Sequence, residues 1–140
     1  MVGGFVSGAE LPSAKFILER RLGLTSAPLV AMGDAPDKPD PTGLISLSSK
    51  LSEIPLGVSN HPIAYVGDTV ADVKTVMNAR IRIPHQKFIS LAIAPPHLHL
   101  KSTQEERKNY EDRLKAAGAD LIIKSLNNFK NQITPLFTNL

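Results

Sequence analysis

The fold is decided by the stretch Ile63-Ala-Tyr-Val-Gly-Asp-Thr-Val-Ala-Asp-Val-Lys-Thr-Val-Met77. Its first four residues are apolar and stop at Gly67, which is typical of a short buried strand. After the glycine, apolar residues recur at helical spacing: Val70, Val73 and Met77. We therefore expect Asp68 at the end of a strand and Asp72 in the first turn of a helix.

These two aspartates lie where α/β proteins bind their ligands. In open α/β sheets the ligand crevice lies beyond the carboxyl ends of the strands. The free N–H groups at a helix N-terminus favour anions there, and two nearby carboxylates favour a hard cation such as Mg2+. The stretch therefore predicts a site for an anion and a metal ion around Asp68 and Asp72.

The rest of the chain repeats this alternation of strands and helices. We predict strands at 5–6, 29–32, 88–94 and 120–124. We predict helices at 12–22, 44–51, 102–117 and 126–137, with 78–84 as a short connection. Such alternation predicts a single α/β domain over residues 1–140, a three-layer Rossmann-like parallel sheet with helices on both faces.

Two finer details are predicted as well. Ser102-Thr-Gln-Glu105 has the spacing of a capping box, so we expect it to start the helix that follows. Tyr65 and Met77 are large and lie within apolar patterns, so we expect both in the core.

Composition excludes several classes of protein. The 140 residues are 42% hydrophobic with a net charge of +3, which suits a globular domain. The absence of cysteine excludes disulfides and thiolate metal sites. Basic residues form no stripe with interleaved aromatics, so we expect no nucleic-acid partner. No apolar run reaches the roughly 20 residues that span a bilayer and no signal peptide is recognisable, so we expect no membrane partner and a cytoplasmic location.

Lys38 lies in the loop Gly33-Asp-Ala-Pro-Asp-Lys-Pro-Asp-Pro-Thr-Gly43. Its prolines exclude regular structure over most of the loop and stiffen the backbone around the lysine. A rigidly presented lysine suits a phosphate or carboxylate partner, although spacing alone favours a solvated loop lysine. His97 and His99 present a similar choice between a zinc pair and a polar loop, and the lack of a third ligand nearby favours the loop.

Four short motifs follow one another along the chain: Val6-Ser-Gly8, Asp37-Lys-Pro-Asp-Pro41, Gly67-Asp-Thr-Val-Ala-Asp72 and Gly118-Ala-Asp-Leu-Ile-Ile-Lys-Ser-Leu126. The first ends a predicted strand with serine, the second carries a lysine before prolines, and the third is a strand-end GDxxxD before a helix. In this order they resemble the second, third and fourth motifs and the closing strand of haloacid dehalogenase-like hydrolases of the phosphatase branch. The resemblance spans nearly the whole chain.

The resemblance implies a role for each matching residue. Asp68 would bind Mg2+ directly, and Asp72 would lie behind the metal ligands or position Lys38. Lys38 would neutralise the phosphoryl group and the nucleophile. Ser7 would hydrogen-bond a phosphoryl oxygen, assisted by the Gly8 backbone N–H. Such roles suit phosphoryl transfer, which needs positioning and charge neutralisation.

The sequence also departs from the family. The first motif, DxDxT or DxDxS, is absent, and with it the nucleophilic aspartate and the general acid/base. In the family this motif ends the central first strand, and a small cap domain usually follows it. The resemblance therefore implies an incomplete core that lacks its first strand, and we expect a truncated gene product, an internal start or part of a split enzyme.

Three functions are open from the sequence. The resemblance implies Mg2+-dependent hydrolysis of phosphate monoesters through a phospho-aspartate, by a form inactive alone. The alternatives are a non-catalytic phosphate- and metal-binding module and a structural α/β module. The expected partners are a small phosphorylated molecule and either a complementing N-terminal polypeptide or a second copy of the chain, because an unfilled strand position favours association through sheet edges.

Overall fold

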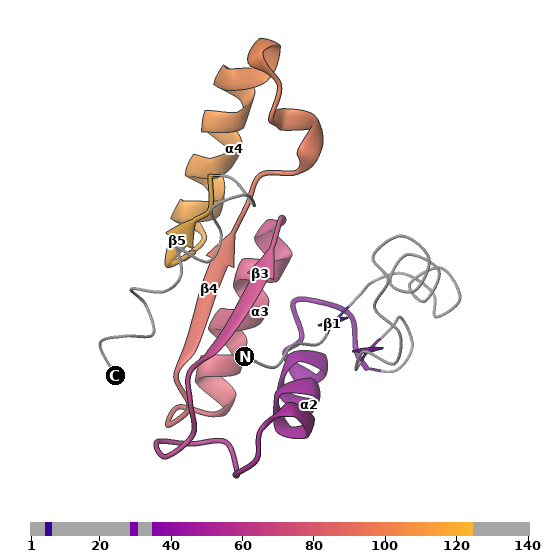
Figure 1. Ribbon diagram of the computed structural model, residues 1–140, viewed down its shortest axis with the longest axis vertical. Coiled ribbons are helices and arrows are strands. Elements are labelled where there is room, and N and C mark those ends of the chain that lie inside the picture. Colours follow the sequence, from indigo (N-terminus) through magenta and orange to yellow (C-terminus); the bar gives the residue numbers. More distant parts are fainter. Residues whose placement is uncertain (1–4, 7–28, 31–34, 125–140) are drawn as a thin grey trace.

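The computed structural model describes residues 5–6, 29–30 and 35–124 (Figure 1). In chain order the elements are β1 (Phe5–Val6), β2 (Leu29–Val30), α2 (Thr42–Leu51), β3 (Ile63–Gly67), α3 (Val70–Arg82), β4 (Phe88–Ala92), the 3-10 helices η2 (Pro96–Leu98) and η3 (Lys101–Thr103), α4 (Gln104–Ala116) and β5 (Leu121–Ile122). All described strand pairs are parallel. The predicted α/β fold, with a parallel Rossmann-like sheet flanked by helices, is confirmed.

Helices α2, α3 and α4 pack on one face of the sheet β3-β4-β5, with α3 between the other two (Figure 1). The register pairs Ile63 with Phe88 and Gly67 with Ala92, so alternate residues of β3 and β4 share this face. Two apolar clusters fill the space beneath the helices. The cluster under α2 and α3 consists of Leu44, Val76, Ala79 and Phe88. The cluster under α3 and α4 consists of Val73, Ala92, Leu114 and Ala119.

Strand β4 is the centre of this sheet. All five of its residues are buried, and Ile89 and Leu91 form a third apolar cluster with Ile123 on the face away from α3. Burial on both faces is typical of the central strand of a parallel sheet. The helices predicted at 12–22 and 126–137 lie outside the described residues.

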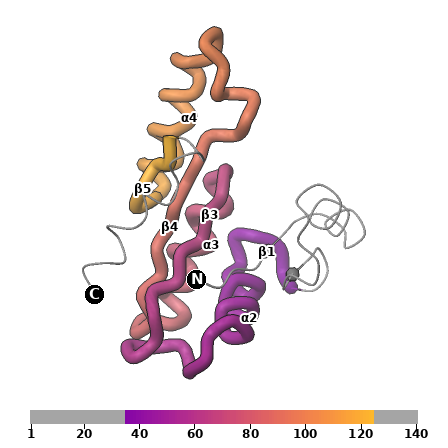
Figure 2. The backbone as a smooth tube through the Cα atoms, in the orientation of Figure 1, coloured from indigo at the N-terminus to yellow at the C-terminus, as the bar shows by residue number. Residues whose placement is uncertain are grey.

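The described strands form two separate sheets. β1 pairs with β2 in a small parallel sheet that contacts α2. Figure 2 follows the chain from α2 through β3, α3 and β4 to α4 and β5. Within the described ranges no backbone pairing joins this sheet to β3, which is an edge strand. The interruption falls between the strand of the second motif and the strand of the fourth, where the resemblance predicts a missing strand.

Helix α3 is longer than predicted. The residues 78–84 were expected to form a connection, but the helix continues to Arg82. Its last turns are held by tertiary contacts: Ala79 is fully buried beside Phe88, and the Arg80 guanidinium donates to the Phe88 carbonyl at 2.8 Å. The prediction that Met77 is a core residue is wrong, because Met77 lies at the edge of the buried face of α3 and is 36% exposed.

The capping box predicted at Ser102–Glu105 is also wrong. Helix α4 begins at Gln104, and its N-cap residue Thr103 makes no side-chain capping bond. The preceding residues form η3 instead, and the Thr103 hydroxyl turns back to the carbonyl of Leu100 at 3.1 Å.

The remaining boundaries are close to the predictions. Helix α2 covers the predicted 44–51 and begins two residues earlier, whereas β4 and β5 are shorter than predicted. Among the described helices, none has both the length and the apolar character needed to cross a membrane.

Candidate functional site

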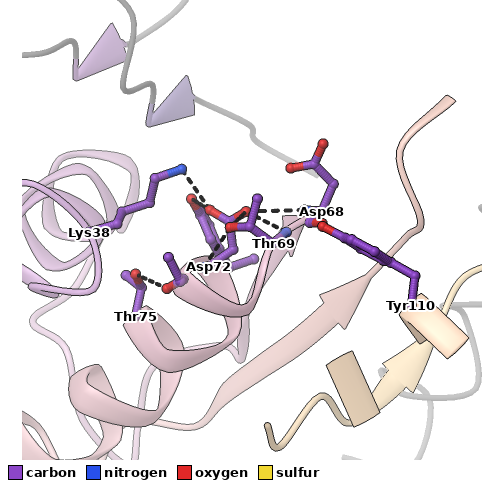
Figure 3. Close-up of polar contacts among 8 residues, drawn as sticks. Lys38, Asp68, Thr69, Asp72, Thr75 and Tyr110 are labelled. Carbon is purple, nitrogen blue, oxygen red and sulfur yellow. Dashed lines mark hydrogen bonds and ion pairs between the residues drawn. The ribbon is translucent and has the colours of Figure 1, made fainter. Parts of the chain in front are cut away.

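The turn between β3 and α3 is closed by a capping box that was not predicted from the sequence. Thr69 is the N-cap residue of α3, and its Oγ1 accepts a hydrogen bond from the Asp72 backbone N–H at 3.1 Å. In return the Thr69 backbone N–H donates to Asp72 Oδ2 at 3.0 Å. This reciprocal pair satisfies two donors at the helix start and folds the Asp72 side chain back over the turn (Figure 3).

Asp72 is a buried carboxylate, 3% exposed, and both of its oxygens are engaged. Oδ2 accepts from the Asp68 N–H at 3.1 Å, the Thr69 N–H at 3.0 Å and the Thr69 hydroxyl at 2.7 Å. Oδ1 accepts from Lys38 Nζ at 2.6 Å and from the Tyr65 hydroxyl at 3.0 Å. A carboxylate offers about four lone-pair sites, so these donors leave none for a metal ion. Of the two roles expected for Asp72, the geometry fits the positioning of Lys38.

The surroundings of Asp72 keep it ionised. Burial alone would raise the pKa of its carboxyl group, but the hydrogen bonds from Lys38 and Thr69, the Lys38 charge and the Tyr65 hydroxyl outweigh burial. The pKa of Asp72 therefore lies below its usual value of 3.8. Burial and the Asp72 charge raise the pKa of Tyr65, so its hydroxyl stays protonated and donates. Tyr65 was predicted as a core residue; its ring is half-buried, and its hydroxyl belongs to the site.

Gly67 is required by the close approach of Asp72. A Cβ atom on residue 67 would lie 2.2 Å from the Asp72 Cβ and 2.7 Å from its Oδ2. Any side chain at this position would push the carboxylate out of its network. The glycine that ends β3 therefore makes room for the aspartate in the first turn of α3.

Polar side chains of α3 hold the loop that carries Lys38. Asp72 binds the Lys38 ammonium, and the Asn78 amide donates to the Pro39 carbonyl at 2.9 Å. Further along α3, the Arg82 guanidinium donates to the Thr42 hydroxyl at 2.8 Å. Spacing alone favoured a solvated loop lysine; that interpretation is wrong, because Lys38 is ion-paired and its side chain is only 26% exposed.

Asp68, unlike Asp72, is exposed to solvent. Its carboxylate points away from Asp72 and Lys38 (Figure 3) and has no hydrogen-bond partner among the described residues. Its backbone is fixed from two sides, because its N–H donates to Asp72 and its carbonyl accepts the Tyr110 hydroxyl at 2.6 Å. Asp68 thus offers two free carboxylate oxygens at the carboxyl edge of the sheet.

The structure brings three of the five predicted site residues together: Lys38, Asp68 and Asp72. Ser7 and Gly8 lie outside the described residues. Elsewhere, His99 Nε2 lies 2.7 Å from the Ala94 carbonyl. Within the described ranges there is no group of three or more His, Asp or Glu side chains that could hold a metal ion by itself.

Three residues of the site were missed from the sequence: Thr69, Tyr65 and Tyr110. A capping-box signal for Thr69 was present, since Thr69 and Asp72 have the required spacing. Neither tyrosine could be found in this way, because only the folded chain shows what its hydroxyl contacts.

Comparison with known proteins gives a similar fold. No family model and no curated protein matches the chain. Its structure is similar to the crystal structure of a phosphonoacetaldehyde hydrolase-like protein from Oleispira antarctica, with a TM-score of 0.62 and 18% sequence identity. The match covers 91% of this chain and 45% of that chain, so the chain spans less than half the length of its structural neighbour. At this identity the likeness shows the fold alone.

Proposed function

We propose that this chain binds a small phosphorylated molecule together with Mg2+, as the lysine- and metal-bearing part of a haloacid dehalogenase-like phosphatase. The observation that carries the proposal is the Lys38 ammonium, held 2.6 Å from the ionised Asp72 at the carboxyl end of β3. This edge of a parallel α/β sheet is where such folds bind ligands. Lys38 is still partly exposed, so a bound phosphoryl group can reach it.

The fixed position of Lys38 suits phosphoryl binding. Phosphoryl transfer depends on positioning and on the neutralisation of oxygen charge. Asp72 fixes the ammonium group, and the tethers from Asn78 and Arg82 fix the loop around it. The ammonium thus meets an incoming anion without first being ordered, which lowers the cost of binding.

Asp68 fits Mg2+ as a single-carboxylate ligand. Mg2+ commonly keeps several waters and is held by one or two carboxylates together with substrate phosphate oxygens, so a cluster of three protein ligands is not required. The exposed Asp68 carboxylate supplies one such ligand. When bound, the metal would neutralise charge on the phosphoryl oxygens.

The sequence has no DxDxT motif, so the nucleophile of the proposed reaction has to be supplied from outside residues 1–140. The proposed source is a complementing segment that carries this motif and pairs with the edge of β3. A second copy of the chain is the alternative partner at that edge, but it would bring no nucleophile. This chain alone is then expected to bind ligands without turning them over. The same absence favours the second candidate function, a phosphate- and metal-binding module without catalysis.

Ligand titration followed by NMR tests the binding site. Inorganic phosphate and Mg2+ are expected to shift the signals of Lys38, Asp68 and their neighbours. Lys38→Met is expected to weaken phosphate binding by about tenfold or more, because a charge-assisted contact is lost. Lys50→Met, which changes an exposed lysine in the last turn of α2, is the matched control and should bind as the wild type.

An aryl phosphate assay with Mg2+ separates catalysis from binding. The chain alone should show no turnover above background. Robust turnover that Asp68→Asn abolishes would contradict the need for a complementing segment. Equal phosphate binding by wild type and Lys38→Met would contradict the proposed site itself.

A further inference from the structure

We propose that the two tyrosines of the chain divide the positioning of the site: Tyr65 serves its anion side and Tyr110 its cation side. The sequence contains no other tyrosine, and both hydroxyls donate into the turn 68–72. They reach it from different elements, Tyr65 from β3 and Tyr110 from α4. The inference rests on the proposed function, because it assigns phosphate to Lys38 and Mg2+ to Asp68.

Tyr65 fixes the oxygen that holds Lys38. Its hydroxyl lies 3.0 Å from Asp72 Oδ1, the same oxygen that accepts Lys38 Nζ at 2.6 Å. The ring packs against the apolar cluster under α2 and α3, so the hydroxyl is aimed by the core. The carboxylate only accepts, so the protonated phenol is the donor. Without this hydrogen bond, Asp72 Oδ1 would be held only by a lysine on a proline-rich loop.

Tyr110 fixes the backbone that carries the metal ligand. Its hydroxyl donates to the Asp68 carbonyl at 2.6 Å, on the side of the turn away from Lys38 (Figure 3). Its ring packs against the cluster under α3 and α4, and the Arg113 guanidinium lies 5.1 Å from the ring centre. The exposed Asp68 side chain has no partner among the described residues, so the orientation of its carboxylate depends on how its backbone is held.

The two hydrogen bonds act on different ligand-facing groups, so their effects should separate. A tyrosine needed only for folding would affect both ligands alike. A tyrosine that positions one group should affect mainly the ligand of that group. This separation distinguishes positioning from a merely structural role.

The test compares Tyr65→Phe with Tyr110→Phe in the full chain, each titrated by NMR with inorganic phosphate and, separately, with Mg2+. Both variants keep the ring and remove only the hydroxyl. Tyr65→Phe is expected to weaken phosphate binding by about fivefold and to change Mg2+ binding by less than about twofold. Tyr110→Phe is expected to weaken Mg2+ binding by about threefold and to leave phosphate binding within about twofold. Equal changes for both ligands, or no change in either variant, would overturn the inference.

Amide hydrogen exchange without ligand separates this inference from the proposed function. The Thr69 amide donates to Asp72 Oδ2, so a loosened carboxylate should expose it. Tyr65→Phe should speed its exchange by about fivefold, and Tyr110→Phe should change it by less than about twofold. If exchange responds in this way but wild type binds neither ligand, the proposed function fails and the positioning by Tyr65 stands. If Tyr65→Phe leaves the exchange unchanged, the positioning is refuted whatever the ligands do.

Discussion

Two regions of the molecule bury a carboxylate against a lysine that is distant in the sequence. In the turn after β3, Asp72 holds Lys38 at 2.6 Å, and on α4 Glu111 holds Lys124 at 2.9 Å. Their exposures are similar, 3% for Asp72 and 7% for Glu111. Burial and ion pairing therefore do not distinguish the candidate site from the other region.

The partners of the two carboxylates differ. Asp72 also receives two backbone N–H groups and two hydroxyls, whereas the other described donor to Glu111 is the Arg107 side chain at 3.4 Å. Lys124 is 67% exposed, while Lys38 is 26% exposed. The Arg107 guanidinium also binds the Lys124 carbonyl at 2.6 Å, so the Glu111 group ties the end of the sheet to α4. Donors fixed by the backbone and the core, rather than burial alone, indicate a site built to hold one side chain in place.

Neutralising each carboxylate should separate the two regions most clearly. Asp72→Asn is expected to lower the free energy of unfolding by about 3 kcal/mol. It breaks a buried ion pair, and it places the amide NH2 group of asparagine against hydrogen-bond donors. Glu111→Gln is expected to cost about 1 kcal/mol, because its lysine partner Lys124 is 67% exposed and can be hydrated. Urea unfolding of both variants measures the two values, and equal losses would show that the two carboxylates stabilise the fold equally.

Filling the space beside Asp72 should have the next largest effect. Gly67→Ala is expected to cost about 2 kcal/mol, because the new Cβ overlaps the Asp72 side chain. The matched control is Gly57→Ala, where the new Cβ meets nothing within 4 Å and only the positive φ of 155° opposes alanine. The control should cost about 1 kcal/mol, all of it from backbone strain. Urea unfolding gives both values, and a Gly67→Ala variant as stable as the wild type would show that Asp72 can move without loss.

Strand β3 and helix α3 were predictable because their signals are local. The apolar period changes at Gly67, and this change placed Asp68 and Asp72 at the strand end and in the first helical turn. Helix α2 was predictable for the same reason, since Leu44, Leu47 and Leu51 share a face. Alternation of such elements was enough for the parallel α/β fold.

Contacts between distant residues were not predictable from spacing. Lys38 and Asp72 are 34 residues apart, and Tyr110 and Asp68 are 42 apart. Nothing local in a proline-rich loop tells where its lysine will point. The capping box shows the same limit at short range, because Ser102–Glu105 and Thr103–Glu106 have the same spacing as Thr69–Asp72 but form no capping box. Thr69 has the extended backbone of an N-cap, with φ −125° and ψ 159°, whereas the residues before α4 form a 3-10 turn.

The pH dependence of stability should arise in part from Asp72. Its pKa is lowered in the folded state, so the unfolded chain binds the proton more readily at acid pH. The stabilisation is complete above the unfolded pKa of about 4 and is lost as the pH falls through the lower folded value. The difference in unfolding free energy between wild type and Asp72→Asn should therefore narrow as the pH falls below about 4 in urea titrations. A difference that stays constant over this range would show that the Asp72 charge is not what stabilises the turn.

The smallest effect should come from the tether between α3 and the Lys38 loop. Asn78→Ala removes the hydrogen bond from the Asn78 amide to the Pro39 carbonyl, worth about 1 kcal/mol. Asn109→Ala is the matched control, since Asn109 is exposed on α4 and has no described partner, and both changes gain helix propensity alike. Asn78→Ala should therefore be less stable than Asn109→Ala by about 1 kcal/mol in urea unfolding. Because the tether holds Pro39 next to Lys38, Asn78→Ala should also bind phosphate about twofold more weakly than Asn109→Ala. Equal stability with weaker binding would mean that the tether orders only the loop. Equal values of both would show that the Asn78 tether does not restrain Lys38, which would leave that role to Asp72 and the Arg82 tether among the described contacts.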